Sequence, residues 1–231
     1  MVDVFFHGIP LANVAAAKIT DITVSPIQWR PTARARPVRA GADFVRNVGG
    51  ERTVAMTFVI LERDTELRQQ AISAVNAWLH TDQPAKLVLP GHPGRYLLAE
   101  CTEFPESYTR QYWTEMRAVW TCYEPYWYSM TEKTCACGTA FTVAGSAPPD
   151  MWITDTLSAT ADRVYSDGTD TMTFDDVPAG NLVIDLEHQT AAVGGTSVMS
   201  TYTFGSTFII PKTGATTITG TGTVHWRERW V

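Results

Sequence analysis

The sequence predicts a mainly β protein that carries one α-helix and is divided into two domains. Three observations lead to this fold class. Apolar and polar side chains alternate around residue 56, which is typical of a strand. A single run with helical spacing follows, and the second half of the chain has frequent turn residues with almost no helical periodicity.

The first strand is predicted within residues 51–63. Its two faces are Val54, Met56, Phe58 and Ile60 on one side, and Thr53, Ala55, Thr57 and Val59 on the other. A helix comes next, with Asp64 or Thr65 as its N-cap. Its apolar stripe is predicted to contain Leu67, Ala71, Val75, Trp78 and Leu79. Such a stripe needs a packing partner, and the neighbouring sheet is the expected one.

A β-hairpin is predicted after the helix. Residues 86–90 form a short apolar run, residues 91–94 read Gly-His-Pro-Gly, and residues 95–104 return as a second strand. Residues 113–122 form a further strand, which ends before the aromatic segment 123–128 at Pro125. The N-terminal domain is therefore expected to be a β-sandwich or barrel-like domain with one helix and one hairpin.

Charge is distributed unevenly along the chain, whose net charge is −6. Residues 1–131 carry 13 Lys+Arg and 13 Asp+Glu, whereas residues 132–231 carry 5 and 11. This step predicts a domain boundary near residue 131, giving domains 1–131 and 132–231. An acidic second half argues against sequence-specific nucleic-acid binding, which needs a basic face. No apolar run is long enough for a membrane span, and no signal peptide is recognisable, so we expect no membrane insertion and synthesis in the cytoplasm.

Short strands separated by polar turns predict a β-sandwich in the second half. The expected strands are residues 171–174, 182–186, 190–193, 208–210, 216–219 and 224–231. In the last of these, Trp226 and Trp230 are expected to pack on one face, with His225, Arg227 and Arg229 on the other. A truncation there should damage the second domain.

Several short motifs, taken in order, resemble the distal tail protein (Dit) family of long-tailed siphophages, components of the baseplate and tail-tip hub. They are the segments Phe6-His7-Gly8-Ile9-Pro10-Leu11, Arg52-Thr53-Val54, Lys86-Leu87, Arg95-Tyr96 and Cys122 to Trp127, followed by a second all-β module. The resemblance spans most of the chain, with poor matching in residues 12–50. It implies that the C-terminal domain is a galectin-like β-sandwich, and the segment Pro178 to Asp185 is similar to that module.

The resemblance also implies a structural role in the virion. Six copies are expected to close into a ring at the tail tip, assembled in the host bacterial cytoplasm. The expected partners are other copies of the chain, the tail tube protein, the tail-tip hub or tail-associated lysin, the tape measure protein, and receptor-binding or baseplate proteins. DNA would pass through the ring without being read.

Candidate metal and cofactor sites are weak. Cys135-Ala136-Cys137 lacks the spacing and second ligand pair of a structural zinc site. Cys101 and Cys122 are expected on neighbouring strands, where a disulfide is conceivable but buried free thiols are commoner. The histidines, His7, His80, His92, His188 and His225, occur singly. A calcium site at Asp175-Asp176, Asp185 and Glu187 is imaginable, but a solvated turn is the simpler interpretation.

No nucleophile elbow, phosphate loop or dinucleotide fingerprint occurs in the sequence. We therefore expect no enzyme activity, no cofactor and no metal.

One basic cluster favours an interaction site. Arg30, Arg34, Arg36, Arg39 and Arg46 lie within a segment whose single acid is Asp43. Interrupting prolines argue against a helix or a clear strand, so a projecting loop is expected. Arg34, Arg36 and Arg39 are the candidate contacts to a neighbouring subunit or tail protein, because a guanidinium pairs bidentately with carboxylates. A solvated loop is the alternative.

A second function class remains open, namely a carbohydrate-binding module that contacts the host cell surface. In that case Trp152, Tyr165 or Tyr202 would stack on a glycan. A galectin-like fold by itself does not establish sugar binding.

Overall fold

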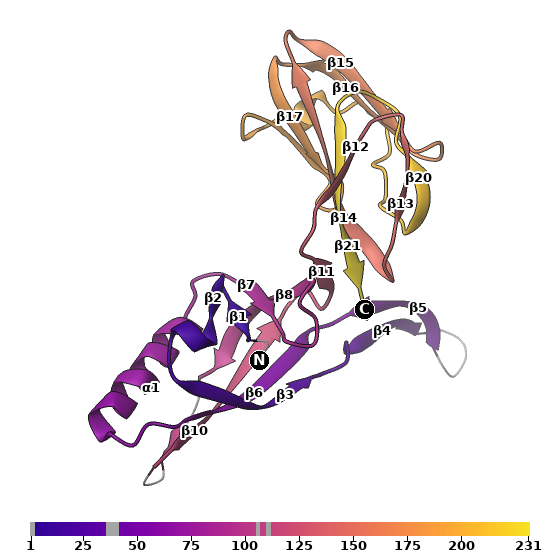
Figure 1. Ribbon diagram of the computed structural model, residues 1–231. Helices are drawn as coiled ribbons and strands as arrows, with labels where there is room; N and C mark the ends of the chain where they lie inside the picture. Colours follow the sequence, from indigo (N-terminus) through magenta and orange to yellow (C-terminus); the bar gives the residue numbers. More distant parts are fainter. Residues whose placement is uncertain (1–2, 36–41, 105–106, 110–111) are drawn as a thin grey trace. The chain divides into compact units, whose positions relative to one another are not determined.

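The computed structural model describes residues 3–35, 42–104, 107–109 and 112–231, with side chains of residues 30–48 and 105–111 left aside. The chain divides into two compact units, Met1–Trp127 (unit 1) and Tyr128–Val231 (unit 2). Both are built mainly of antiparallel strands, and α1 (Thr65–Leu79) is the one α-helix of the described residues (Figure 1). The predicted fold class, mainly β with one helix, is confirmed.

Unit 1 is built on a sheet in the order β8-β10-β6-β3, extended by shorter strands. Its strands are β1 (Phe5–Phe6), β2 (Ile9–Pro10), β3 (Ala17–Val24), β6 (Arg52–Ile60), β7 (Ala85–Val88), β8 (Arg95–Glu103), β9 (Ser107–Thr109) and β10 (Thr114–Cys122). A separate antiparallel pair is formed by β4 (Trp29–Ala35) and β5 (Ala42–Gly49). A short 3-10 helix, η1 (Leu11–Asn13), precedes β3, and β11 (Trp127–Ser129) spans the boundary between the units.

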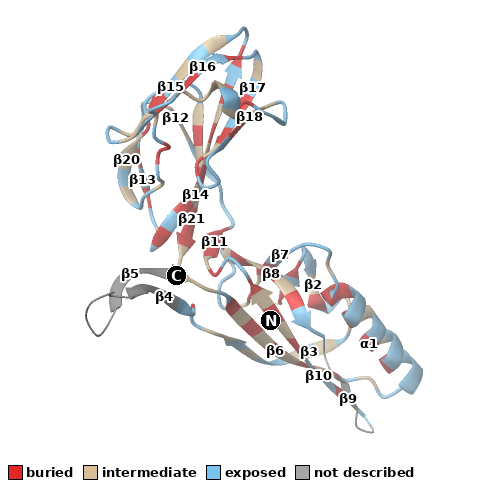
Figure 2. Ribbon diagram, turned by 180° about the vertical axis from the view of Figure 1, so that it is seen from behind, coloured by how far each residue is buried: buried red, intermediate tan, exposed pale blue. Residues whose placement is uncertain are grey.

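The central strand β6 confirms the predicted alternation. Its even-numbered side chains from Arg52 to Ile60 are buried and the odd-numbered ones are half-buried. The predicted hairpin is present as β7 and β8, which pair at Leu87 and Leu97. Figure 2 marks the buried residues along these strands and on α1.

The helix begins where predicted but buries a different stripe. Asp64 is the N-cap, and its Oδ1 accepts the backbone N–H groups of Glu66 at 2.8 Å and Leu67 at 3.1 Å. The predicted Val75, Trp78 and Leu79 are buried, but the prediction for Leu67 is wrong, because it is 52% exposed. Arg68 and Ile72 are buried as well, whereas Ala71 is half-buried. The burial of Arg68 is consistent with its hydrogen bond from Nη1 to the Glu62 carbonyl at 3.2 Å.

The inner face of α1 meets the sheet through aromatic rings. Phe6, Trp78 and Trp120 make mutual edge-to-face contacts with centroids 5.8–6.3 Å apart. The N-terminal hairpin β1–β2 turns at His7 and Gly8, both with positive φ. It is tied to the helix because Trp78 Nε1 donates to the Ile9 carbonyl at 3.0 Å.

Unit 2 contains one larger sheet and two strand pairs around a common core. The larger sheet has the order β19-β18-β17-β14-β21, with β12 paired to β21. Its strands are β12 (Lys133–Ala136), β14 (Ala147–Leu157), β17 (Gly180–Asp185), β18 (Thr190–Val193), β19 (Thr196–Ser197) and β21 (Thr223–Trp230). The pairs are β15 (Ala161–Ser166) with β16 (Thr171–Val177), and β13 (Ala140–Val143) with β20 (Gly214–Thr217); a 3-10 helix, η2 (Met199–Thr201), also occurs.

Side chains from both sets of strands form one core in unit 2. Ile153, Ile184 and Val224 come from the larger sheet, whereas Met172 and Phe174 come from β16. This arrangement is that of a β-sandwich.

Two predictions for unit 2 need correction. Residues 208–210 are not a strand; Phe208 and Ile209 are buried in irregular backbone, which a short apolar run alone cannot distinguish from a strand. The long strand β14 was not among the expected strands, and its Pro148 and Pro149 are unusual within a strand. It accommodates them at a register shift between Ala147 and Asp150.

The alternation predicted for the last strand holds only in part. Val224 and Trp226 are buried as expected for one face, but Glu228 takes the next buried position. It accepts hydrogen bonds from Lys133 Nζ at 2.6 Å and from the Ala144 backbone N–H at 3.0 Å. Arg229, expected on the face turned to water or a partner, is 4% exposed, and Trp230 is only half-buried.

Candidate interaction surfaces

The basic segment of unit 1 forms a hairpin, so the prediction of a loop without clear strands is wrong. Strands β4 and β5 pair with Arg30 opposite Val48, Thr32 opposite Arg46, and Arg34 opposite Asp43. Prolines are tolerated at the edges of such a two-stranded ribbon. Arg36 and Arg39 lie outside the described residues, so among the three predicted contact residues only the backbone of Arg34 is placed.

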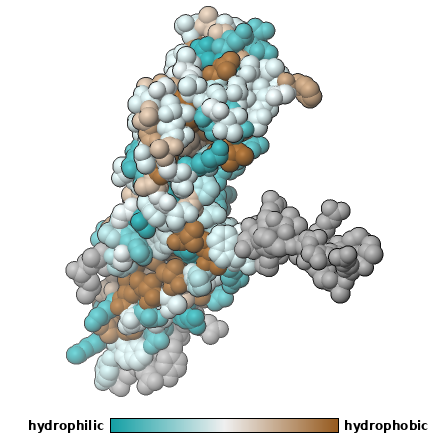
Figure 3. Space-filling view, turned by 90° about the vertical axis from the view of Figure 1, so that its right-hand side faces the viewer, coloured by the Kyte–Doolittle hydropathy of each residue, from teal (hydrophilic) through white to brown (hydrophobic). Residues whose placement is uncertain are grey.

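Strand β3 is a second candidate surface, because it ends the sheet of unit 1. Its Ala17, Ile19, Ile22 and Val24 side chains are half-buried, although their partners on β6 are fully buried. Lys18 and Asp21 place charges along this edge, and a register shift lies between Ile19 and Asp21. An apolar edge strand can accept another strand, and charges and bulges limit unwanted pairing. Figure 3 shows an elongated hydrophobic patch on unit 1, whereas hydrophobic side chains on unit 2 occur as separate spots.

The carboxylates considered for calcium do not converge. Asp185 Oδ1 accepts the backbone N–H groups of Glu187 and His188 at 2.9 Å each, which caps a turn. Asp175 accepts the Thr203 hydroxyl at 2.9 Å, and Glu187 pairs with Arg229. Within the described part of the chain, no group of three or more His, Cys, Asp or Glu side chains is arranged to hold a metal ion.

All four cysteines are free thiols. Cys101 lies opposite Trp120 on neighbouring strands, and Cys122 is two residues from Trp120, so the predicted neighbouring strands are present without a disulfide. Burial raises the pKa of Cys101 to about 11 and that of Cys122 to about 12. Burial also raises the pKa of Cys137 to about 11. These thiols therefore stay protonated at neutral pH and are poor nucleophiles.

The histidines lie apart from one another, and each makes its own local contacts. His7 Nε2 lies 3.0 Å from the Trp78 carbonyl, and the His92 ring packs on Trp127 with centroids 4.6 Å apart. His225 lies between Glu132 and Thr154, with contacts of 2.9 Å to both. His188 contacts Asp185 at 2.8 Å, and His80 lies 3.9 Å from Asp82.

The aromatic residues proposed for glycan stacking do not form a shared exposed platform. Tyr165 is fully buried, and its hydroxyl donates to Asp155 Oδ2 at 3.3 Å. Trp152 stacks on His225 at 5.3 Å, and the guanidinium of Arg227 lies 5.5 Å from its ring centre. Tyr202 stacks on Phe208 at 4.9 Å.

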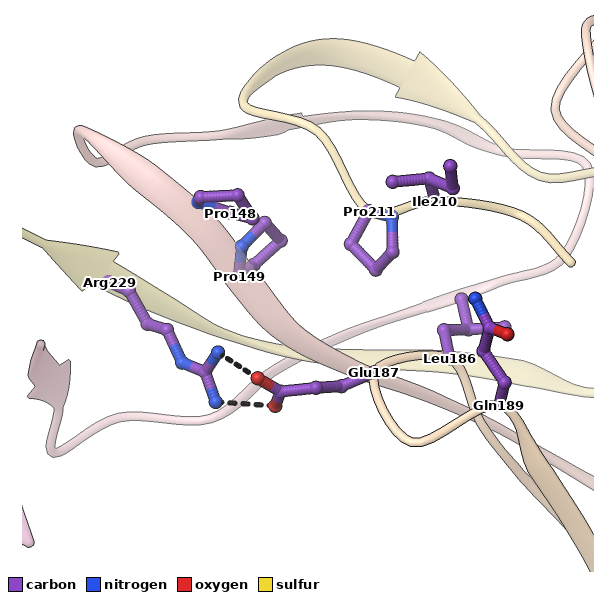
Figure 4. Close-up of a pocket in the computed structure, with 8 residues that line it drawn as sticks. All are labelled: Pro148, Pro149, Leu186, Glu187, Gln189, Ile210, Pro211 and Arg229. Carbon is purple, nitrogen blue, oxygen red and sulfur yellow. Dashed lines mark hydrogen bonds and ion pairs between the residues drawn. The ribbon is translucent and has the colours of Figure 1, made fainter. Parts of the chain in front are cut away.

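Unit 2 has a surface pocket of about 230 Å³ beside Arg229 (Figure 4). It is lined by Pro148, Pro149, Leu186, Glu187, Gln189, Ile210, Pro211 and Arg229. Both terminal nitrogens of Arg229 bind Glu187 at 2.6 Å, and its guanidinium lies 4.5 Å from the centre of the Tyr128 ring. Burial opposes the charge of Arg229, but the hydrogen bonds to Glu187 and the electrostatic attraction of Tyr128, Glu187 and Asp150 together outweigh it, and the pKa of Arg229 is raised. The ion pair fixes the end of β21, and none of the eight lining residues is a Ser, Thr, Cys, His or Lys nucleophile.

Two features of unit 2 were not predicted from the sequence. Asp155 is a buried carboxylate that joins three segments, and nothing in its local sequence distinguishes it from a surface aspartate. Phe204 is 103% exposed on a turn. The dipeptide Phe204-Gly205 in an uncharged polar segment was the available signal for that turn. The described residues contain no helix long and apolar enough to cross a membrane.

This fold, a helix-bearing β unit followed by a β-sandwich, is found among phage hub and baseplate proteins. The chain is similar to the SPP1 Dit (gp 19.1) protein, described as a paradigm of the hub adsorption apparatus in phages that infect Gram-positive bacteria. The TM-score is 0.80 at 16% sequence identity, covering 99% of each chain. It is also similar to a chain of the phage P2 baseplate in its activated conformation with Ca, with a TM-score of 0.53 and 8% identity over 95% of this chain and 92% of that one.

Comparison with family models found no match, and neither did comparison with curated protein sequences. At these low identities the likeness is one of fold. The predicted resemblance to the distal tail protein is thus confirmed at the level of the fold, over nearly the whole chain.

Proposed function

We propose that this chain is a non-enzymatic structural protein of a phage tail tip, acting in the virion as a Dit-like hub subunit. One observation carries the proposal: a single fold likeness to the SPP1 Dit protein spans 99% of both chains and therefore includes both units and their order. A shared single domain would be weaker support, because common folds serve many functions.

Unit 1 is proposed as the ring-forming part, corresponding to the predicted domain 1–131. Head-to-tail contacts between identical subunits close into a ring when two different surfaces of each subunit are complementary. The open edge β3 and the hairpin β4–β5 are two such different surfaces, one partly apolar and one rich in arginine. Six copies are proposed to form the ring that joins the tail tube to the tail-tip hub or tail-associated lysin, beside the tape measure protein.

Unit 2, corresponding to the predicted domain 132–231, is proposed as a docking platform for receptor-binding or other baseplate proteins. Its excess of acids over bases, 11 to 5, favours partners with basic surfaces. Assembly would take place in the host cytoplasm before the tail tip is completed.

Negative-stain electron microscopy of the purified full-length chain tests the proposal. Six subunits of 25.5 kDa form a particle large enough for symmetry classification. Six-fold rings would support it. If the chain stays monomeric alone and also fails to enter rings when mixed with its tail tube protein, the proposed function is wrong.

A carbohydrate-binding module has less support. Of its three predicted contact residues, Tyr165 is buried, and Trp152 already has His225 and Arg227 against its ring.

A further inference from the structure

The side chain of Phe204 is the most exposed large hydrophobic group in the described part of the chain. Its relative exposure is 103%, whereas the next most exposed, Leu61, reaches 60%. Single exposed hydrophobic residues are common and usually need no explanation. Full exposure of an aromatic ring is unusual enough to examine what holds it there.

The backbone around Phe204 is firmly anchored. Ser206 N–H donates to the Thr203 carbonyl at 3.2 Å, which closes a β-turn with Phe204 and Gly205 at its centre. Gly205 has φ +89°, as the third position of a type II turn requires. Thr203 N–H donates to the Thr173 carbonyl and Thr207 N–H to the Thr171 carbonyl, both at 2.9 Å. The residues on both sides of the turn therefore bond to β16 as those of a neighbouring strand would.

Side chains on either side of the turn strengthen this anchoring. Tyr202 packs edge-on against Phe174 at 5.2 Å and stacks on Phe208, which is 8% exposed. The Ser206 hydroxyl accepts the Thr173 backbone N–H at 3.2 Å. Aromatic neighbours before and after the turn are thus packed into the core, while Phe204 points away from it.

The surroundings of the turn are acidic. The Thr203 hydroxyl donates to Asp175, and the backbone N–H of the next residue, Asp176, donates to Asp162. Residues 161–177 contain five aspartates and a single basic residue, Arg163. Arg163 is paired with Asp155 at 2.5 Å, and Lys212 lies 3.6 Å from Asp167, so the excess of acid in this segment comes from its other aspartates.

We propose that Phe204 is the anchor by which unit 2 binds an outer tail-tip protein, inserting into an apolar pocket rimmed by lysine or arginine. The inference rests on the proposed tail-tip function. An aromatic residue on a preorganised turn loses little backbone entropy on binding, and aromatic residues are enriched at interfaces. The aspartates beside it select a basic rim and steer the encounter.

The test compares phage particles whose tails are assembled with the wild-type chain and particles assembled with a variant of it. Quantitative mass spectrometry of purified particles measures each tail protein at physiological and raised salt. With Phe204→Ala, we expect the affinity for one outer protein to fall by a factor of about thirty, which is the loss typical of a hot-spot residue. The amount of that protein in the particles should fall accordingly. The matched control is Val183→Ala, a half-exposed apolar side chain on β17.

A charge variant tests the basic rim separately. Asp175→Asn with Asp176→Asn removes two charges and keeps oxygen acceptors, and Asn tolerates the positive φ of residue 176. Retention of the outer protein should weaken and become less dependent on salt. Unchanged retention of the outer protein would overturn the proposal that its pocket has a basic rim.

The outcomes separate this inference from the proposed function. Absence of the wild-type chain from purified tails would overturn the proposed function. Full retention of every tail protein with Phe204→Ala would overturn the proposal that Phe204 is the anchor, and would leave the proposed function untouched. Failure of the folded Phe204→Ala chain to enter particles would also overturn it, since Phe204 would then contact the tail itself. Unchanged chemical unfolding of this variant, expected for a fully exposed side chain, verifies that it is folded.

Discussion

Asp155 shows how one buried side chain connects distant segments of unit 2. It lies on β14 and is 8% exposed. Its Oδ2 accepts hydrogen bonds from Arg163 Nε at 2.5 Å, from Thr221 Oγ1 at 2.6 Å and from the Tyr165 hydroxyl at 3.3 Å. Burial by itself raises the pKa of Asp155, but the hydrogen bonds from Thr221, Arg163 and Tyr165 and the charge of Arg163 together outweigh burial, and the pKa is lowered from 3.8.

We expect Asp155→Asn to lower the free energy of unfolding by about 3 kcal/mol at neutral pH, since it leaves Arg163 without its charge partner. The folded-state pKa lies below the unfolded value of 3.8. The stabilisation by the wild-type carboxylate is therefore complete above that value and disappears as the pH falls through the folded-state pKa. The difference between wild type and variant should accordingly shrink in acid. Urea unfolding at a series of pH values measures it.

Asp162→Asn is the matched control for this measurement. Asp162 is exposed on the same hairpin, and the asparagine oxygen can still accept the Asp176 N–H. A loss with Asp155→Asn that stays constant down to strongly acid pH would contradict the charge explanation and leave only a packing effect.

At the scale of elements, the helix and the basic hairpin illustrate two kinds of local signal. The N-cap of α1 is a purely local feature, and the sequence places it correctly at Asp64. The choice between Leu67 and Arg68 for the core is not local, because both positions border the same face of a helix with 3.6 residues per turn. The position of the sheet decides it.

The hairpin β4–β5 carries the prediction about ring assembly. Replacing Arg34, Arg36 and Arg39 together by alanine should weaken ring formation, since each lost charge-assisted hydrogen bond costs about 1.5–3 kcal/mol. Light scattering coupled to size-exclusion chromatography, over a range of protein concentrations, measures the shift toward smaller species.

Arg63→Ala with Arg117→Ala serves as the control for this triple variant. Both side chains are exposed in unit 1 and lie outside the hairpin. If the triple variant forms rings at the same concentration as wild type, the hairpin is a solvated segment and the interface lies elsewhere.

At the scale of the whole molecule, the two units have different dependence on the C-terminal strand. β21 lies between β14 and β12 and places Val224 and Trp226 in the core of unit 2. No residue of β21 belongs to unit 1. Loss of this strand should therefore be a severe change for one unit and a mild one for the other.

Deletion of residues 223–231 is expected to unfold unit 2 and to leave unit 1 folded. Limited proteolysis followed by mass spectrometry should then yield a resistant N-terminal fragment that ends near residue 127. Deletion of Val231 alone, which is 50% exposed, is the control and should leave both units resistant. Resistance of unit 2 after the larger deletion would show that β21 is dispensable.

The sequence by itself determined what depends on local periodicity and turn chemistry. It predicted the mainly β class, the strand around Met56, the helix with its cap, the hairpin at Gly91 and the resemblance to the distal tail protein. The elements follow from the spacing of neighbouring side chains, whereas the resemblance rests on the order of short motifs along the chain.

Only the tertiary structure decided which polar and aromatic residues are buried and which are presented to solvent. It buried Arg229 against Glu187 and Tyr165 against Asp155, and it left Phe204 fully exposed. It also made a strand of the proline-bearing residues 147–157. The physical reason is the same in each case: burial depends on partners far away in the chain, such as Glu187 and Arg229, which are 42 residues apart, and local sequence does not encode them.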